Sequence, residues 1–369
     1  MSVAVAEPRQ TISWWRTSFG DEELRSLKEA IAHEHVGQGP VTRRFEAQLA
    51  EMVGVPYALA TPSGSMALLL ALLALGIGRD DEVIVPNRAW IAVAHAVMML
   101  GARVVLVDVQ PDVPVMDVSL IRRKLTARTK AIVPVHLNGR AVDLEAVKAL
   151  AREYGLLVIE DAAQALFSKN AQGYLGTQSD IGCFSLSPAK VISTGQGGVA
   201  VTRSHATYEK LQLIRSHGVA DLINVSYTQL GFNFKFPDLL AAVGLAQLAR
   251  VGTRIDQLHA VYAKYATALE ALPFLKLIPV NVAAGEVPLY VEVICPERER
   301  LIAVLRSHGI QARPFYPDLS EAEYVHARDA FPHSHRFSRQ GVFLPCGPDQ
   351  PLERIDRVVE VLRTYQRGR

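Results

Sequence analysis

Apolar and polar residues follow two alternating patterns over residues 57–201. Short runs rich in Val, Ile and Leu predict strands, and longer stretches with an apolar residue at every third or fourth position predict helices. Strands are expected at residues 82–86, 103–107, 131–135 and 156–161, and helices at residues 65–75, 89–100 and 143–154. The run at residues 156–159 is apolar throughout, as in a strand covered on both faces. This order is typical of a mostly parallel sheet between helices, which binds ligands at the carboxyl ends of its strands.

The chain on either side of this region has a more helical pattern. Further helices are expected at residues 21–33, 42–52, 237–250, 255–272 and 298–308, with one more strand at residues 287–295. The segment 37–40, Gly-Gln-Gly-Pro, is too rich in glycine and proline to continue either of the first two helices. We therefore expect an α/β fold with a large domain over residues 1–250, which includes the N-terminal helices, and a small α+β domain over residues 251–369.

Composition narrows the classes of partner and compartment. The 39 basic and 37 acidic side chains leave a net charge of +2 without a block of Lys and Arg, so nucleic acid is not an expected partner. The longest apolar run, residues 66–75, is about half the length of a membrane span, and the first residues form no export signal. Cys183, Cys295 and Cys346 are far apart and odd in number, which suits a reducing compartment. We expect a cytoplasmic protein with no membrane association.

Asp161 and Lys190 are the first candidates for chemistry. Asp161 ends an apolar strand, where a carboxylate points into the ligand crevice, although an aspartate in this context could equally cap a helix. Lys190 follows small and apolar residues, and burial there would lower its pKa and give a nucleophilic amine; the alternative is a solvated loop lysine. Pyridoxal phosphate chemistry requires an amine for the aldehyde and a carboxylate for the pyridine nitrogen. The two residues together favour a pyridoxal phosphate site.

A phosphate site is expected at residues 61–65, Thr-Pro-Ser-Gly-Ser, which join a predicted strand to a predicted helix. Free amides and hydroxyl groups converge at such a helix start, on the same sheet edge as Asp161, although simple helix capping would use the same residues. Ser185 offers a further hydroxyl group. Trp90 begins another helix at this edge and is expected to stack on the pyridine ring, the alternative being a position in the core.

Two other patterns carry less weight. Residues 195–200 fit the dinucleotide pattern GxGxxA, but they precede a strand-like run, whereas that motif must open a helix. The histidine pairs His33/His35 and His333/His335 have no third ligand near them in the sequence, so no metal site is expected.

Longer motifs spread over residues 21–362 resemble those of the DegT/DnrJ/StrS family of sugar aminotransferases. The matching segments are Gly39-Pro40, Phe45-Glu46, residues 63–68, 76–86, 160–165 and 180–185, Lys190, residues 194–198, Gly231-Phe232-Asn233 and residues 244–248. The resemblance implies the type I fold of pyridoxal phosphate enzymes, similar to aspartate aminotransferase. That fold has a large domain with a mostly parallel seven-stranded sheet and a small C-terminal α+β domain.

The resemblance also implies a role for each matching residue. Lys190 takes the position of the lysine that forms a Schiff base with the cofactor, and Asp161 pairs with the pyridine nitrogen. Gln164 reaches the ring hydroxyl group, and Trp90 stacks on the ring. The phosphate is held by Ser63, the Gly64 backbone, Ser65 and Ser185. Asn233 reaches the phosphate bound by the other subunit, which implies a homodimer with shared sites.

Four positions depart from the family pattern. Ser65 replaces the usual threonine and keeps a hydroxyl group, and Lys235 replaces the arginine that follows the Gly-Phe-Asn motif. Leu166 stands where the family often has histidine, and residues 316–319, Tyr-Pro-Asp-Leu, stand where it often has Pro-Leu-His. These changes concern the substrate side of the expected site.

The resemblance implies a transaminase that moves an amino group from an amino acid, glutamate, to a nucleotide-linked 4-keto or 3-keto hexose. Lys235, Arg215 and His217 are expected to meet the diphosphate or hydroxyl groups, with Tyr316 also on the substrate side. A transaminase for an unactivated aminocyclitol ketone and a non-catalytic regulator that binds the cofactor remain open. A dehydratase of the same fold is disfavoured, because such enzymes have histidine in place of Lys190.

Overall fold

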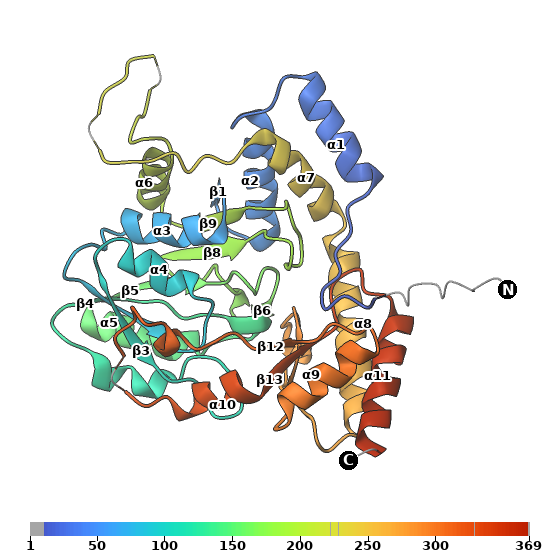
Figure 1. Cartoon of the computed structure of the whole chain (residues 1–369). Helices are drawn as coiled ribbons and strands as arrows, with labels where there is room; N and C mark the ends of the chain where they lie inside the picture. The colour runs from blue at the N-terminus through green and yellow to red at the C-terminus, as the bar shows by residue number, and fades with distance from the viewer. Residues whose placement is uncertain (1–10, 222, 228, 328, 368–369) are drawn as a thin grey trace.

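The computed structural model of the chain describes residues 11–221, 223–227, 229–327 and 329–367. Within these ranges, seven strands form a sheet of order β1-β9-β8-β5-β4-β2-β3 (Figure 1). The strands are β1 (Tyr57–Thr61), β2 (Glu82–Pro86), β3 (Arg103–Val107), β4 (Thr129–Ile132), β5 (Leu157–Asp161), β8 (Ile181–Ser185) and β9 (Gly198–Thr202). Neighbours pair in parallel, except that β9 is antiparallel to β8 and β1. The expected mostly parallel sheet of seven strands is confirmed.

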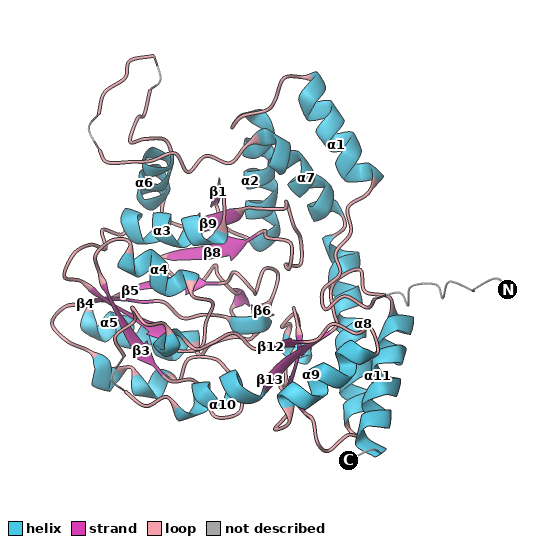
Figure 2. Ribbon diagram, in the orientation of Figure 1, coloured by secondary structure: helices cyan, strands magenta, loops and turns pink. Residues whose placement is uncertain are grey.

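Helices cover both faces of this sheet (Figure 2). They are α3 (Gly64–Ala74), α4 (Ala92–Met98) and α6 (His205–Arg215) on one side and α5 (Leu144–Tyr154) on the other. Successive side chains of strand β2 point to opposite faces of the sheet. Val83 and Val85 pack in one core cluster with α3 and α4, whereas Ile84 packs in another with α5. The strand is therefore buried on both sides, as its apolar sequence predicts.

Three further helices form a group beside β1. They are α1 (Asp21–Ala32), α2 (Pro40–Val53) and α7 (Asp238–Ala249). The carboxylate of Asp238 accepts hydrogen bonds from the amides of Gly39 and Thr42, both at 2.8 Å, and from the Thr42 hydroxyl group at 2.6 Å. An amide in the first turn of a helix has no acceptor within the helix, so Asp238 fixes the start of α2 against α7.

The C-terminal part is built on a second sheet, which is antiparallel and has the order β10-β11-β13-β12. Its strands are β10 (Lys276–Leu277), β11 (Val291–Ile294), β12 (Arg313–Pro314) and β13 (Gly341–Leu344). The helices of this part are α8 (Val251–Leu269), α9 (Arg298–Ser307), α10 (Pro332–Gln340) and α11 (Leu352–Arg367). This mixture of helices and antiparallel strands is the α+β part that the sequence predicts, and the domain boundary after residue 250 stays a prediction.

Short elements complete the described chain. A two-stranded ribbon joins β6 (Lys169–Asn170) to β7 (Gly173–Tyr174). Single turns of 3-10 helix lie at Val118–Leu120, Arg122–Lys124, Leu137–Gly139, Val282–Ala284 and Leu319–Glu321.

Several expected elements have different ends. The strand expected at residues 287–295 is confined to β11, because Asn138 bonds to both backbone groups of Tyr290 and removes them from the ladder. The strand expected at residues 131–135 ends as β4 before Pro134, which has no amide hydrogen. Helix α4 begins at Ala92 instead of residue 89, so Trp90 lies in the turn that precedes it.

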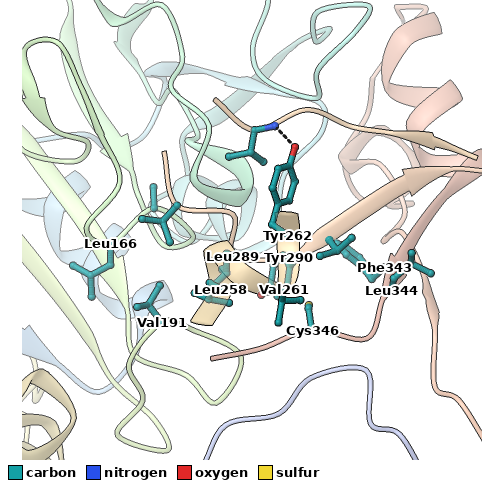
Figure 3. Close-up of a cluster of buried hydrophobic side chains, with 14 of the residues drawn as sticks. Leu166, Val191, Leu258, Val261, Tyr262, Leu289, Tyr290, Phe343, Leu344 and Cys346 are labelled. Atoms are coloured by element: carbon teal, nitrogen blue, oxygen red, sulfur yellow. Dashed lines mark hydrogen bonds between the residues drawn. The ribbon is translucent and has the colours of Figure 1, made fainter. Parts of the chain in front are cut away.

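One apolar core joins the two sheets (Figure 3). Leu166 and Val191 of the large part share this cluster with Leu258 of α8 and with Phe343 and Leu344 of β13. Leu166 follows β5, and Val191 follows the candidate lysine, so burial of this cluster fixes both loops of the sheet edge against the C-terminal part.

The first described residues run between the two parts of the molecule. Ile12 forms a bridge with Ile310, and Trp15 forms one with Cys346 next to β13. The Trp15 indole donates a hydrogen bond of 2.9 Å to the carbonyl of Pro188, in the loop between β8 and β9. This segment therefore connects the C-terminal part to a loop of the large sheet.

Two expectations drawn from composition can be compared with the described residues. No helix in the described ranges has the length and apolar character that a membrane span requires. Cys183, Cys295 and Cys346 are all described, and they are buried thiols that form no disulfide.

Candidate active site

A cavity of about 300 Å³ lies where the carboxyl ends of β5 and β8 face the C-terminal part. It is lined by nine of the residues singled out from the sequence: Ser63, Gly64, Ser65, Trp90, Asp161, Gln164, Ser185, Lys190 and Tyr316. Trp14 and Tyr290, which the sequence did not single out, line it as well. The fold thus gathers the candidates at the sheet edge expected for a ligand.

Lys190 lies in the loop between β8 and β9, half-buried on the wall of the cavity. Burial lowers the pKa of Lys190 to about 8, and the charge of Asp161 counteracts part of this effect. The loop is held by the Tyr290 hydroxyl group, which donates to the carbonyl of Ala189 at 2.9 Å, and by the Trp15 indole on Pro188. An amine with this pKa is neutral often enough near pH 8 to act as a nucleophile and as a base.

Asp161 is the last residue of β5 and lines the cavity. Its carboxylate accepts a hydrogen bond of 3.0 Å from the amide of Ala163, and the described chain turns here without starting a helix, so the helix-cap alternative is not observed. Burial raises the pKa of Asp161 above its ordinary value, an effect that the charge of Lys190 reduces. A cation in the cavity would therefore help to keep this carboxylate ionised.

Gln164 is oriented by a residue that the sequence did not reveal. Its side-chain oxygen accepts a hydrogen bond of 2.9 Å from the amide of Asn138, which leaves its NH2 group for the cavity. Asn138 has a left-handed backbone (φ 56°) and is fully buried, where its side chain bonds to the backbone of Tyr290 and to Glu292. The Asn138-Gly139 pair is a turn signal in the sequence, but that signal does not name its distant partners.

The start of α3 forms a cradle for an anion. Ser63 caps the helix, because its hydroxyl oxygen accepts the amide of Met66 at 3.2 Å, and the first turn contains no acidic residue. The amides of Gly64 and Ser65 have no acceptor within the helix. Gly64 approaches Ser185 so closely that an added Cβ would lie 2.9 Å from the Ser185 Cβ. Backbone amides and hydroxyl groups thus converge on one end of the cavity.

Aromatic side chains form another wall of the cavity. Trp90 contacts Tyr316 edge to face, with 4.7 Å between ring centroids, and half of its surface is exposed, so it is not a core residue. Trp14 packs against Tyr290 at 5.8 Å, and the Arg313 guanidinium lies 4.2 Å from the Trp14 ring. These rings offer flat apolar surfaces with a few polar groups at their edges.

Four candidates from the sequence lie outside the cavity. Arg215 is buried in an ion pair of 2.6 Å with Glu46, which corrects the expectation that it meets the substrate. Its partner Glu46 lies too far away in the sequence to be recognised there. His217, Asn233 and Lys235 lie beyond α6 on the path to and from a projecting part of the chain.

We call this part the projecting segment, and it comprises residues 219–221, 223–227 and 229–232 (Figure 1, upper left). Its apolar side chains are exposed, with Ile223 91%, Tyr227 84% and Leu230 86% accessible. Asn233 directly follows it and forms a bridge with Ser216. Exposed apolar groups that follow one another along a segment are typical of an interaction surface.

The groups around the cavity fit the pyridoxal phosphate that the sequence predicts. A cationic ring nitrogen would offset the cost of burying the Asp161 carboxylate, and the amide cradle at Gly64 suits a phosphate. A dinucleotide does not fit residues 195–198, because these lead into β9 and not into a helix.

Comparison with known proteins gives matches over most of the chain. The model of the DegT/DnrJ/EryC1/StrS aminotransferase family matches residues 17–363. The chain is 30% identical to the GDP-perosamine synthase of Vibrio cholerae over 359 residues, which cover 95% of this chain and 98% of that one. It is 35% identical to the GDP-perosamine synthase of Caulobacter vibrioides over 326 residues, covering 86% and 88%. Its structure is similar to that of S. venezuelae DesV in complex with a ketimine intermediate, with a TM-score of 0.89, 31% identity and 94% of each chain covered.

Proposed function

The chain belongs to the DegT/DnrJ/EryC1/StrS aminotransferase family, and from this premise we propose that it moves an amino group from an amino acid to a nucleotide-linked keto-sugar. It is a pyridoxal phosphate-dependent transaminase. The observation that carries the proposal is one cavity that holds a lysine of lowered pKa, a buried carboxylate and an amide cradle.

Each part of the cofactor has a matching group in the cavity. Asp161 would pair with the ring nitrogen, Gln164 would donate to the ring hydroxyl group, and Trp90 would cover one face of the ring. The phosphate would be held by Ser63, Gly64, Ser65 and Ser185. When bound, pyridoxal phosphate supplies an electron sink that stabilises negative charge on the carbon that loses a proton.

Lys190 has two tasks in this proposal. Its Nζ would hold the cofactor covalently at rest and would be released when an amino acid binds in the cavity. The free amine would then serve as the base in one half-reaction and as the acid in the other, at the carbon that loses or gains the proton. A pKa of about 8 suits both tasks, because neither protonation state of Lys190 is rare near neutral pH.

The acceptor is a nucleotide-linked 4-keto or 3-keto hexose, and the donor is glutamate. Support comes from the similar GDP-perosamine synthases, whose name includes a guanosine diphosphate sugar. Tyr316 lines the cavity in contact with Trp90 and offers a hydroxyl group on the substrate side. Arg313 does not line the cavity but lies over Trp14, which does, and would offer a cation near this wall for a diphosphate group.

The working unit of the proposal is a homodimer in the cytoplasm. The projecting segment exposes apolar side chains that a second copy would cover, and Asn233 at its end would then reach the cradle of that copy. Lys235, which follows Asn233 closely, would arrive at the same place. Buried thiols without a disulfide support a reducing compartment.

The test uses the visible absorbance of the purified enzyme loaded with pyridoxal phosphate. Glutamate is expected to bleach the visible absorption band of the bound cofactor, and the correct keto-sugar is expected to restore that band. The panel contains GDP-linked, TDP-linked and UDP-linked 4-keto-6-deoxyhexoses, their 3-keto isomers, and an inosose as the unactivated ketone. Lys190→Ala is expected to show neither change, and Lys130→Ala, which removes an exposed lysine of β4, is expected to behave as the wild type.

The outcomes separate the candidate functions. Restoration by a nucleotide-linked sugar supports the proposal and names the nucleotide. Restoration by the inosose alone would assign the enzyme to aminocyclitol synthesis. If no amino acid bleaches the band while the cofactor stays attached to Lys190, the chain is a regulator and the proposal is wrong.

A further inference from the structure

A second group of chemically active side chains lies outside the cavity. Within the described residues, single ligand atoms of Asp318, Glu321 and His335 all lie within 4.8 Å of one another. His335 comes from α10, and the two acidic residues come from the 3-10 turn at Leu319–Glu321 and the residue before it. The sequence shows no third ligand near the pair His333/His335, and the fold brings Asp318 and Glu321 to His335 from a segment well before it in the chain.

Asp318 in this group has an unsatisfied carboxylate oxygen. The residue is 2% exposed, and its Oδ1 receives the Arg88 guanidinium at 3.1 Å. Its Oδ2 has no hydrogen-bond donor among the described residues. His335 Nε2 lies 3.9 Å from this oxygen, and the amide of Glu321 donates to the Asp318 carbonyl. A buried oxygen without a partner is costly and calls for a bound group.

We propose that Asp318, Glu321 and His335 bind a divalent transition-metal ion of the zinc type, with water completing its coordination. One imidazole nitrogen and two carboxylates are a donor set that such ions accept, in catalytic and in structural sites. In a tetrahedral zinc site, ligand atoms lie about 3.3 Å apart, given bonds of about 2.0–2.1 Å. The 3.9 Å between His335 Nε2 and Asp318 Oδ2 would therefore shorten by about half an ångström.

The two outer ligands are accessible and adjustable. Glu321 and His335 line a surface cavity, so an ion can enter from solvent. Glu321 accepts hydrogen bonds of 3.1 Å from Ser338 and 3.4 Å from the Asp318 amide, and both contacts are long enough to be given up cheaply. Asp318 is the fixed ligand, because Arg88 holds its other oxygen.

Positive charges near the site limit its affinity but do not occupy it. Arg88 contacts Asp318 Oδ1 and leaves Oδ2 to the site. Arg298, on the cavity wall, bonds to Glu299 at 2.9 Å and to the carbonyl of Ser338. Arg339 also lines the cavity and is exposed, so solvent screens its charge. We expect micromolar rather than nanomolar binding.

The proposed ion would stabilise the wall of the cofactor cavity from outside. Arg88 joins Asp318 to the carbonyl of Tyr316, which lines that cavity. The amides of Leu319 and Ser320 bond to Asn87 at the end of β2. An ion bound by Asp318, Glu321 and His335 would therefore link α10, which carries His335, to the segment that carries the two carboxylates. The proposal stands independently of the transaminase function, because none of the three ligands lines the cofactor cavity.

The test titrates the loaded enzyme with CoCl2 after dialysis against a chelator. Protein-bound Co2+ in a four- or five-coordinate site absorbs at longer wavelengths than the cofactor. Wild-type enzyme is expected to bind one Co2+ per chain, and ZnCl2 is expected to displace it. His335→Ala and Glu321→Gln are expected to weaken binding at least tenfold. His333→Ala, on the same helix but outside the group, is expected to bind as the wild type does.

The variants change half-buried or exposed positions and keep the Arg88 pair, so they are expected to fold, which the cofactor band of each protein checks. A wild-type enzyme without a Co2+ band overturns the proposal. Equal affinity in wild type and His335→Ala also overturns it, because the ion would then bind elsewhere. Loss of the band in His335→Ala but not in His333→Ala supports it.

Discussion

Two consecutive carboxylates of β5 have opposite properties because a strand sends neighbouring side chains to opposite faces. Glu160 is fully buried, yet hydrogen bonds from His136 at 3.0 Å and from the amides of Gly176 and Gln178 overcome burial and hold its pKa below the ordinary value. Asp161 has one amide donor, and burial raises its pKa. The charge of Asp161 therefore depends on what the cavity contains, whereas that of Glu160 does not.

The pKa of Lys190 gives a prediction for cofactor capture. The rate at which the apoenzyme attaches pyridoxal phosphate should follow the neutral fraction of the amine, and should rise about tenfold between pH 7 and 9 and then level off. Stopped-flow absorbance measures this rate. The reaction of pyridoxal phosphate with a free alkylamine, measured in parallel, corrects for the change in reactivity of the aldehyde itself with pH. A rate that still rises tenfold per unit above pH 9 would show an ordinary lysine pKa.

Individual residues were predictable where their chemistry is local. Lys190, Asp161 and Gln164 occur in short motifs, and the structure brings them to one cavity. Asn138 was missed, because its contacts with Tyr290 join residues about 150 positions apart. Arg215 was assigned to the substrate for the same reason, since only the fold places a distant carboxylate beside it. Long-range partners of polar residues were the part that the sequence concealed.

At the scale of elements, the cradle depends on how closely β9 approaches the start of α3. Gly198 is the first residue of β9 and pairs with Thr61 and Ser185. An added Cβ on Gly198 would lie 2.3 Å from the carbonyl oxygen of Ser63, far inside contact distance. The glycine therefore keeps the turn before α3 against the sheet.

Gly198→Ala is expected to push this turn away and to weaken cofactor binding at least tenfold, or by about 1.4 kcal/mol. Equilibrium titration with pyridoxal phosphate, followed by absorbance, measures the change. Gly252→Ala is the matched control, because nothing lies within 4 Å of its added Cβ in α8. Equal affinity in both variants would mean that the cradle tolerates displacement.

Elements were predicted well where periodicity was strong. Strands β2 and β3 have the bounds expected from their apolar runs. Helix α8 begins at Val251, four residues earlier than expected, because the chain bends at Arg250 without glycine or proline to mark the turn. Strand β11 is shorter than its apolar run, because a side chain took the backbone groups that would have extended it. The shorter β11 thus arises from a tertiary contact, which periodicity does not encode.

On the scale of the whole molecule, a shared site predicts complementation between inactive variants. Lys190→Ala and Asn233→Ala are each expected to be impaired, but co-expressed chains would form mixed dimers with one complete site. The purified mixed dimer should have about half of the wild-type activity, because one of its two sites is complete. The assay measures transamination after the mixed dimer is purified with two different tags.

The control pairs Lys190→Ala with the double variant Lys190→Ala/Asn233→Ala, which leaves no complete site in any combination. Mixed dimers that are no more active than their parents would contradict site sharing. A monomeric mass by light scattering for the active enzyme would contradict it more directly.

The bridge between Trp15 and Cys346 also bears on how the protein is made. Trp15 leaves the ribosome long before its partner Cys346 does. The large sheet has all its strands by Thr202, yet the Trp15 bond to Pro188 gains its support only when the chain around β13 has emerged. Contacts between distant parts of a chain form slowly. Assembly of the lysine loop is thus a late event in folding, because it waits for the chain around β13.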